Sequence, residues 1–273
     1  MVLFPNCKIN LGLHITRKRE DGYHDLETVF YPIGIKDVLE IIQAPNPTQP
    51  FRFSSTGLAI QGNPTDNLCA KAYQLLKKDF PQMPPIQMHL HKQIPMGAGL
   101  GGGSADGSFA LKLLNQLFHL DISEDQLIQY ALELGSDCPF FIINQACLGK
   151  GRGEILERLT LDLSQYQFLI VNPGIHIGTG WAFSQIKPKP VEHALISLIN
   201  QPIAIWKDHL INDFEAPVMA AYPAIAQIKN ALYQAGALYA SMSGSGSTLY
   251  GIFEKGHTPK ISFPDHYMTA QVD

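Results

Sequence analysis

The chain has 273 residues, of which 45% are hydrophobic and 16% are charged, and these values predict a globular protein with one large domain or two modest ones. The net charge is −4 and no long run of Lys or Arg occurs, which argues against a nucleic-acid-binding protein. The N-terminus lacks the basic segment of a signal peptide, and no apolar run is long enough for a membrane helix. We therefore expect a cytoplasmic protein that binds neither nucleic acid nor membrane.

The spacings of cysteine and histidine indicate neither a disulfide framework nor a metal site. His89 and His91 lie two apart in a strand-like run, and an exposed strand face explains that spacing better than a zinc site. No C-x-x-C pair occurs, so we expect reduced thiols at all four cysteines, Cys7, Cys69, Cys138 and Cys147.

An apolar residue occupies every second position from Cys7 to Ile15, which predicts a half-buried strand. Lys8 and Asn10 then share the other face, which we expect to point away from the core. Asp21-Gly22 predicts a turn. Further strands are expected over 37–42 and 51–54, then a helix over roughly 67–80 and a strand in "IQMHLHKQIP".

This last strand leads into the glycine-rich loop "PMGAGLGGGSAD", which contains G-x-G-x-x-G at Gly97, Gly99 and Gly102. Apolar residues then recur at helical spacing from Ala105 to Leu117, and Ser104 is a candidate N-cap for that helix. A second helix is predicted to begin near Ser123, with Gln126 completing a capping box, and to end at Gly135.

Three interpretations of the glycine loop compete. A dinucleotide site requires a second strand with an acidic residue about 20 positions on, but Asp121 falls between two predicted helices. A P-loop requires G-K-[ST] after the glycines, which is missing. A flexible turn is disfavoured because an apolar strand runs directly into a helix. What remains is a loop of bare amides at a helix N-terminus, which binds anions such as phosphate.

The second half of the chain begins with another glycine cluster, "GKGRGE", and then changes in composition near residue 155. "QFLIVNPG" predicts a strand, helical segments follow to about 235, and "LYASMSGSGSTLYGIF" predicts a strand, a glycine loop and a strand. We expect two domains, over 1–155 and 156–273.

Three motifs in order resemble those of the GHMP kinase superfamily, across residues 6 to about 253. The glycine loop is similar to the central motif, "KINLGLHITRKREDGYHDLETVF" to the first, and "SMSGSGSTLYGIF" to the third. The resemblance implies an α+β, two-domain GHMP kinase fold with the active site in the cleft between the domains. The N-terminal domain would be ribosomal-protein-S5-like and bind ATP, and the C-terminal domain would be ferredoxin-like.

The D-G-Y-H block and "NDFE" at 212–215 resemble one branch of this superfamily. That branch implies ATP-dependent phosphorylation of the 2-hydroxyl of a cytidine-diphosphate-linked methylerythritol, in the non-mevalonate route to isoprenoid precursors. It also implies Mg²⁺ with the ATP, a small-molecule substrate, and a monomer or weak homodimer. A catalytically silent nucleotide-binding protein on the same scaffold is the alternative, and the presence of both Lys8 and Asp137 argues against it.

The resemblance also implies residue roles. Asp137 matches the general base, although local sequence alone favours a helix or turn cap, and Lys8 matches its partner lysine. The metal ligands are not identified; Ser104 is one candidate, and its role as an N-cap is the equal alternative. The residues matching the ATP site are Asn67, Pro95, Met96, Gly97, Ala98, Gly99, Leu100, Gly101, Gly102, Gly103 and Ser104.

The substrate side is implied in the same way. Tyr23, His24 and Phe183 match a cytosine-binding group, with core packing as the alternative and Trp181 as a neighbouring ring. The remaining matches are Asn10, Thr179, Gly244 and Gly246, where a tight hairpin is the alternative explanation for the glycines. Gly107 and Cys7 depart from the alanines usual in the family, and we expect Gly107 to weaken its helix slightly.

Overall fold

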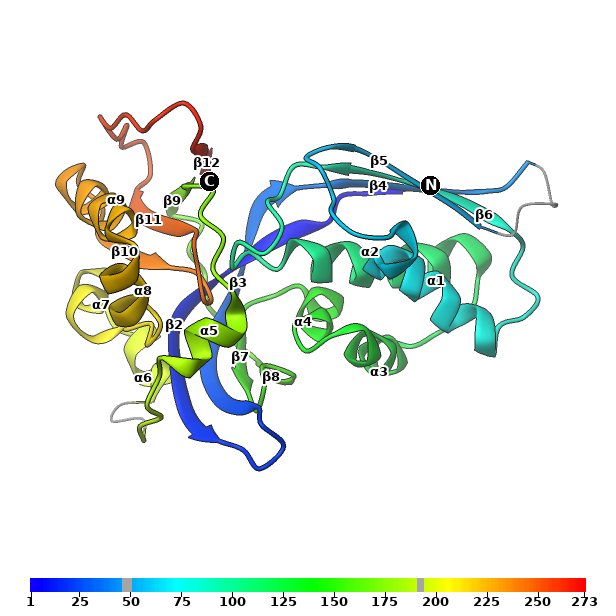
Figure 1. The fold of residues 1–273 in the computed structure, drawn as a ribbon, viewed down its shortest axis with the longest axis horizontal. Coiled ribbons are helices and arrows are strands. Elements are labelled where there is room, and N and C mark those ends of the chain that lie inside the picture. The colour runs from blue at the N-terminus through cyan, green and yellow to red at the C-terminus, as the bar shows by residue number, and fades with distance from the viewer. Residues whose placement is uncertain (46–50, 191–193) are drawn as a thin grey trace. The chain divides into compact units, whose positions relative to one another are not determined.

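The computed structural model describes residues 1–45, 51–190 and 194–273, and the described chain divides into two compact units (Figure 1). The first unit comprises Met1–Cys7, Ile35–Met96 and Gly101–Asn144. The second comprises Lys8–Gly34, Gly97–Leu100 and Gln145–Asp273. Each unit mixes helices with strands, which confirms the α+β class. The division at residue 155 into two domains stays a prediction.

The first unit contains a mixed sheet with helices on one face (Figure 1). Its strands lie in the order β1 (Val2–Leu3), β4 (Val38–Gln43), β6 (Ile86–Lys92) and β5 (Phe51–Gly57), with β5 parallel to β6. The helices are η1 (Pro64–Asp66), α1 (Leu68–Asp79), α2 (Gly102–Phe118), α3 (Glu124–Leu134) and α4 (Cys138–Ile143). Burial alternates along β6, as its sequence predicts.

His89 and His91 lie on the face of β6 opposite the buried side chains. Ser54 Oγ lies 2.9 Å from His89 Nδ1, and Thr56 Oγ1 lies 3.0 Å from both His89 Nε2 and His91 Nδ1. Among the described residues no group of three or more His, Cys, Asp or Glu could hold a metal ion. The two histidines therefore take part in cross-strand hydrogen bonds on an open sheet face.

Helix α2 begins at Gly102, two residues earlier than the sequence predicts. Its N-cap is Gly101, which takes the left-handed conformation at φ +70°, and Ser104 lies within the first turn. The prediction that Ser104 caps this helix is therefore wrong, because glycine enters that conformation without the steric cost that other residues meet. The capping box of Ser123 with Gln126, the end of α3 at Gly135 and the position of Asp121 between two helices are confirmed.

A buried ionic cluster joins β6 to α2 in the first unit. Lys92 Nζ donates to Asp37 Oδ2 and, at 2.7 Å, to Asp106 Oδ2. Asp37 Oδ1 accepts from the backbone N–H groups of Gln93 and Ile94 at 2.6 and 2.9 Å. Asp106 Oδ1 is buried and accepts no hydrogen bond from the described residues. Burial raises the pKa of Asp106 to about 8, since one ammonium cannot compensate two buried carboxylates.

The second unit contains two sheets. One has the order β2 (Asn6–Lys18), β3 (His24–Lys36), β7 (Cys147–Lys150) and β8 (Ile155–Arg158). The first two residues of β2 and the last two residues of β3 belong to the first unit. The other is antiparallel, in the order β10 (Tyr239–Met242), β11 (Leu249–Glu254), β9 (Tyr166–Asn172) and β12 (Met268–Val272). The helices are α5 (Thr179–Ser184), α6 (Leu195–Ile199), α7 (Ile203–His209), α8 (Glu215–Ala221) and α9 (Pro223–Gln234).

The core of the second unit forms where β2 meets β9, β10 and β11. Leu13, Val171, Phe214, Met242 and Phe253 are among its buried members. Strand β2 is buried on both faces from Asn6 to Leu13, with Lys8 and Asn10 only 3% and 2% exposed. The expectation that Lys8 and Asn10 point away from the core is therefore wrong: the alternation identifies two faces, and other segments cover both.

The cysteines all lie in described residues, are buried and form no disulfide, as expected for reduced thiols. None of the helices in the described parts of the chain is both long and apolar enough to cross a membrane.

Candidate active site

Segments of the first and third motifs are hydrogen-bonded to the stretch Gly97–Leu100 of the central motif, in the second unit. The backbone N–H of Lys8 donates to the carbonyl of Leu100 at 3.0 Å, and that of Thr248 donates to the carbonyl of Ala98 at 3.3 Å. Ser243 Oγ donates to the carbonyl of Gly99 at 2.7 Å. The first and third motifs therefore flank the middle of the glycine loop, although they lie far apart in the sequence.

The ammonium group of Lys8 sits among polar atoms of this junction. Lys8 Nζ donates to Asn10 Oδ1 at 2.6 Å and to the Gly99 carbonyl at 3.0 Å, and it lies 5.4 Å from the centre of the Phe30 ring. Asn10 Nδ2 donates to Thr28 Oγ1 at 2.9 Å, which fixes the amide so that its oxygen faces the ammonium. The lysine head is thereby held in one orientation within the unit.

Two glycines make this packing feasible. Gly99 has φ +79°, and a Cβ on it would lie 2.0 Å from the carbonyl oxygen of Ser243. Gly244 has φ +58°, and a Cβ there would lie 3.3 Å from the Cα of Gly99. The backbones of the second and third motifs are thus in direct contact, which residues with side chains would prevent. Gly246, at φ +92°, completes the turn of the third motif.

Two residues of this junction carry roles that sequence reasoning missed. Asn212, in "NDFE", is 1% exposed and its Nδ2 donates to the carbonyls of Met242 and Gly244 at 2.7 and 2.9 Å. Ser243 contacts the loop through its hydroxyl, as described above. Asn212 belonged to a motif with no role assigned, and a serine among glycines carries no signal of its contacts.

The residues matched to cytosine binding form two pairs on the second unit. His24 stacks on Phe183 with ring centres 4.9 Å apart and planes 22° from parallel, and Phe183 meets the ring of Phe214 edge-on. Tyr23 is 57% exposed, and the guanidinium of Arg152 lies 5.0 Å from its ring centre. Arg152 belongs to "GKGRGE", whose role the sequence left open.

The turn that presents Tyr23 is held by charged side chains. Arg19 pairs with Asp21 at 2.9 Å and with Asp25 at 3.1 Å, and Asp21 Oδ1 accepts from the backbone N–H of Tyr23 at 3.0 Å. The hydrogen bond from Arg19 lowers the pKa of Asp21, and those from Arg17 and Arg19 lower the pKa of Asp25. These exposed ion pairs define the turn geometry more than they stabilise the fold.

Helix α5 carries Thr179, a further hydroxyl residue, and Trp181, a further ring. Thr179 is the first residue of this helix and is exposed. Trp181, the ring adjacent to Phe183 in sequence, is 36% exposed and meets Tyr222 edge-on at 5.8 Å. Trp181 thus pairs with Tyr222, whereas Phe183 pairs with His24, which distinguishes the two candidate rings.

In the first unit, Asp137 immediately precedes α4 and its side chain makes no capping hydrogen bond to that helix. The alternative of a simple helix cap is thereby weakened. Asn67, by contrast, is the N-cap of α1, and its Oδ1 accepts from the N–H of Cys69 at 2.9 Å. Ser104 accepts a hydrogen bond from Ser108 Oγ at its carbonyl, 2.8 Å away. Helix capping thus accounts for Asn67, whereas Asp137 makes no such capping hydrogen bond.

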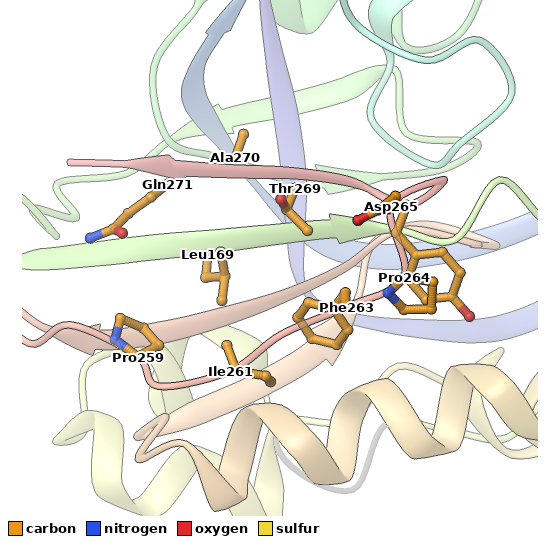
Figure 2. A pocket seen from close by; sticks show the side chains of 10 residues that line it. Leu169, Pro259, Ile261, Phe263, Pro264, Asp265, Thr269, Ala270 and Gln271 are labelled. Carbon is orange, nitrogen blue, oxygen red and sulfur yellow. The ribbon is translucent and has the colours of Figure 1, made fainter.

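A hollow of about 450 Å³ lies elsewhere on the second unit (Figure 2). Figure 2 shows the side chains that line it, which come from β9, β12 and the segment that precedes β12, including Ile261, Phe263 and Asp265. None of the residues matched to ATP or substrate lines it. The site therefore rests on the motif junction and not on this hollow.

Two models of known protein families match the chain. The model of the GHMP kinases N terminal domain matches residues 67–145, and that of the GHMP kinases C terminal matches residues 195–261. Both matches follow the order in which the motifs occur.

Individual relatives are similar to the chain over nearly its whole length. The chain is 52% identical over 264 residues to a 4-diphosphocytidyl-2-C-methyl-D-erythritol kinase of Bacteroides thetaiotaomicron, with 96% of each chain covered. It is 45% identical to the kinase of the same name from Cytophaga hutchinsonii, covering 93% of this chain and 92% of the relative.

Solved structures agree. A crystal structure of 4-(cytidine 5'-diphospho)-2C-methyl-D-erythritol kinase superposes with a TM-score of 0.79 at 27% identity, covering 92% of this chain and 90% of the other. A homoserine kinase from Cytophaga hutchinsonii superposes with a TM-score of 0.67 at 14% identity, covering 98% of this chain and 95% of the other, which shows a shared fold.

Proposed function

The chain belongs to the GHMP kinases, within the family of 4-diphosphocytidyl-2-C-methyl-D-erythritol kinases, and from this premise we propose that it phosphorylates the 2-hydroxyl of 4-diphosphocytidyl-2-C-methyl-D-erythritol. The phosphate donor is ATP, and the products are ADP and the 2-phosphate. The observation that carries the proposal is the junction at Gly97–Leu100, where segments of the three kinase motifs share hydrogen bonds.

The phosphates of ATP bind along the loop from Pro95 to Ser104. Gly97, Gly99 and Gly101 all have positive φ, so this backbone turns tightly and presents N–H groups where a side chain would block them. The first turn of α2 adds the positive end of a 17-residue helix. Ser104, in the first turn of α2, is the residue whose hydroxyl oxygen would help to hold the Mg²⁺ that accompanies ATP.

We assign Asp137 as the general base and Lys8 as its cationic partner. Asp137 accepts the proton of the substrate 2-hydroxyl as its oxygen attacks the γ-phosphorus, and the bond from that phosphorus to the bridging oxygen of ADP breaks. Lys8 offsets negative charge as it develops. When bound, Mg²⁺ neutralises charge on the phosphate oxygens. The chain supplies position, which is the main requirement of phosphoryl transfer.

The cytidine part of the substrate binds at the His24–Phe183 stack and the Tyr23 ring of the second unit. Tyr23 offers an exposed ring for stacking on the base, and His24 offers a ring nitrogen for its polar edge. Phe183 supports His24 by stacking. Asn10, Thr179 and the Gly244–Gly246 turn contact the methylerythritol and phosphate portion. A cytoplasmic location and a monomer or weak homodimer complete the proposal.

The deciding assay measures ADP release by the purified protein with ATP and Mg²⁺. The cytidine substrate, homoserine, mevalonate and galactose are tested in parallel. We expect turnover with the cytidine substrate alone. Inactivity on all four would overturn the kinase assignment, and selective turnover of another alcohol would reassign the acceptor within the superfamily.

A further inference from the structure

We propose that Ser243 is a positioning residue that holds the Lys8 ammonium and the Gly99 carbonyl together for phosphoryl transfer. The inference rests on the function proposed above and assigns a role to a residue outside the predicted site. Ser243 follows β10 directly and opens the third-motif turn.

The hydroxyl of Ser243 and the ammonium of Lys8 share the same two acceptors. Ser243 Oγ lies 2.7 Å from the Gly99 carbonyl oxygen and 3.4 Å from Asn10 Oδ1. Lys8 Nζ lies 3.0 Å from the same carbonyl and 2.6 Å from the same amide oxygen. The four groups form a closed cluster, so a displacement of either acceptor also displaces the lysine head.

The backbone on both sides of Ser243 is fixed. Its N–H donates to the carbonyl of Thr248 at 2.9 Å, and its carbonyl accepts from the N–H of Gly246 at 3.1 Å. Asn212 holds the carbonyls of Met242 and Gly244, one residue away on either side. The hydroxyl of Ser243 therefore has a defined direction.

Burial increases the effect of losing the hydrogen bond between Ser243 and the Gly99 carbonyl. Ser243 is fully buried, and Lys8 and Asn10 are nearly so. With the Ser243 hydroxyl removed, the Gly99 carbonyl loses its shorter hydrogen bond and keeps the longer one from Lys8. Both groups then gain freedom, and displacements near 1 Å from the productive geometry cost on the order of 100-fold in rate.

Ser241, on the strand β10 that precedes Ser243, provides a matched control. It is 1% exposed, lies two residues earlier, and its Oγ donates to Glu215 Oε1 at 3.0 Å. Ser241→Ala and Ser243→Ala each remove one buried serine hydroxyl group, so we expect similar falls in melting temperature. Only Ser243→Ala acts on the cluster around Lys8.

The kinetic test compares these variants with the wild-type chain. We expect Ser243→Ala to lower kcat about 10- to 100-fold relative to Ser241→Ala, while KM for the cytidine substrate changes less than about threefold. Equal kcat values for the two variants would overturn the proposal, as would a loss confined to KM.

A second measurement does not depend on turnover. Competitive acetylation followed by mass spectrometry gives the reactivity of Lys8 relative to the surface residue Lys71. We expect Lys8 labelling to rise several-fold in Ser243→Ala and to stay at the wild-type value in Ser241→Ala. If the wild-type chain releases no ADP, the kinase proposal fails, and unchanged Lys8 labelling in Ser243→Ala would separately refute the positioning role.

Discussion

At the scale of single residues, the environment of Lys8 explains how a cation can serve a phosphate site. Its contacts with Asn10 and the Gly99 carbonyl are with uncharged acceptors. These two acceptors orient the ammonium group of Lys8. These contacts support the role proposed for Lys8 beside Asp137, the proposed base.

Asp137→Asn is expected to lower kcat by about 10²- to 10⁴-fold, because the amide cannot accept the hydroxyl proton. ATP binding should remain within about twofold by calorimetry, since the phosphate loop is untouched. Asp125→Asn, in the first turn of α3, is the control and should keep wild-type turnover. Retention of most activity in Asp137→Asn would refute the base assignment.

Arg152 supports the exposed ring of Tyr23 and adds a positive charge beside the proposed cytidine site. Arg152→Met keeps much of the apolar stem and removes the charge, so KM for the cytidine substrate should rise roughly tenfold, equivalent to about 1.4 kcal/mol. KM for ATP should not change. Arg17→Met, at a 71% exposed arginine paired with Asp25, is the control in steady-state kinetics. An equal effect of both variants would speak against a specific role for Arg152.

At the scale of elements, Gly107 shows how packing reverses a propensity argument. The sequence suggests that alanine would strengthen the start of α2. A Cβ on Gly107 would lie 2.8 Å from the Cβ of Leu68 on α1, which cannot move without its backbone. Glycine here permits the close contact of α1 with α2.

We therefore expect Gly107→Ala to lower the free energy of unfolding by about 1–3 kcal/mol, the usual cost of overpacking. Gly180→Ala, in α5 where a Cβ would meet nothing within 4 Å, should instead stabilise by up to about 1 kcal/mol. Urea denaturation of both variants gives the comparison. A stabilised Gly107→Ala would mean that the helices can separate at no cost.

The Lys92–Asp37–Asp106 cluster predicts a pH dependence of stability. Burial raises the pKa of Asp106, whose Oδ1 accepts no hydrogen bond from the described residues, so Asp106 takes up a proton below about pH 8. In the unfolded chain an aspartate releases its proton near pH 4. Between about pH 4 and pH 8 the native state binds this proton and the unfolded chain does not. The stability that proton binding contributes is therefore lost as pH rises toward 8.

Asp106→Asn should remove this dependence. Between pH 5 and pH 8 the wild-type free energy of unfolding should fall by at least about 1 kcal/mol more than that of the variant, since one pKa unit corresponds to about 1.4 kcal/mol. Urea titrations at the two pH values measure these free energies of unfolding. Asp37→Asn, which should be destabilised at both pH values, is the comparison variant. Parallel pH profiles for wild type and Asp106→Asn would show that Asp106 is ionised throughout.

At the scale of the whole molecule, ATP should stabilise the chain before any second substrate binds. A ligand at 100 times its Kd raises the free energy of unfolding by about 2.7 kcal/mol. Gly99→Ala should abolish the ATP-dependent rise in melting temperature, because its Cβ would strike the Ser243 carbonyl. Gly256→Ala, also at positive φ but facing open space, should keep the rise. An ATP-dependent rise in Gly99→Ala would place the nucleotide elsewhere.

Much of the fold could be predicted because its signals are local. Alternation predicted β2 and β6, a capping box and a glycine predicted both ends of α3, and the missing strand after α2 excluded a dinucleotide fold. The start of α2 escaped prediction, because a serine near several glycines does not reveal which residue adopts the left-handed conformation.

The sequence by itself determined the family, the order of the motifs and the type of nearly every element near the site, because these depend on spacing along the chain. Only the tertiary structure showed that Lys8 and Asn10 are buried and that Ser243, Asn212 and Arg152 contact motif residues. Hydrogen bonds between Lys8 and Gly99, and between Ser243 and Gly99, span 91 and 144 residues. Periodicity tells which residues share a face, whereas the segment that covers that face is chosen by packing between distant parts of the chain.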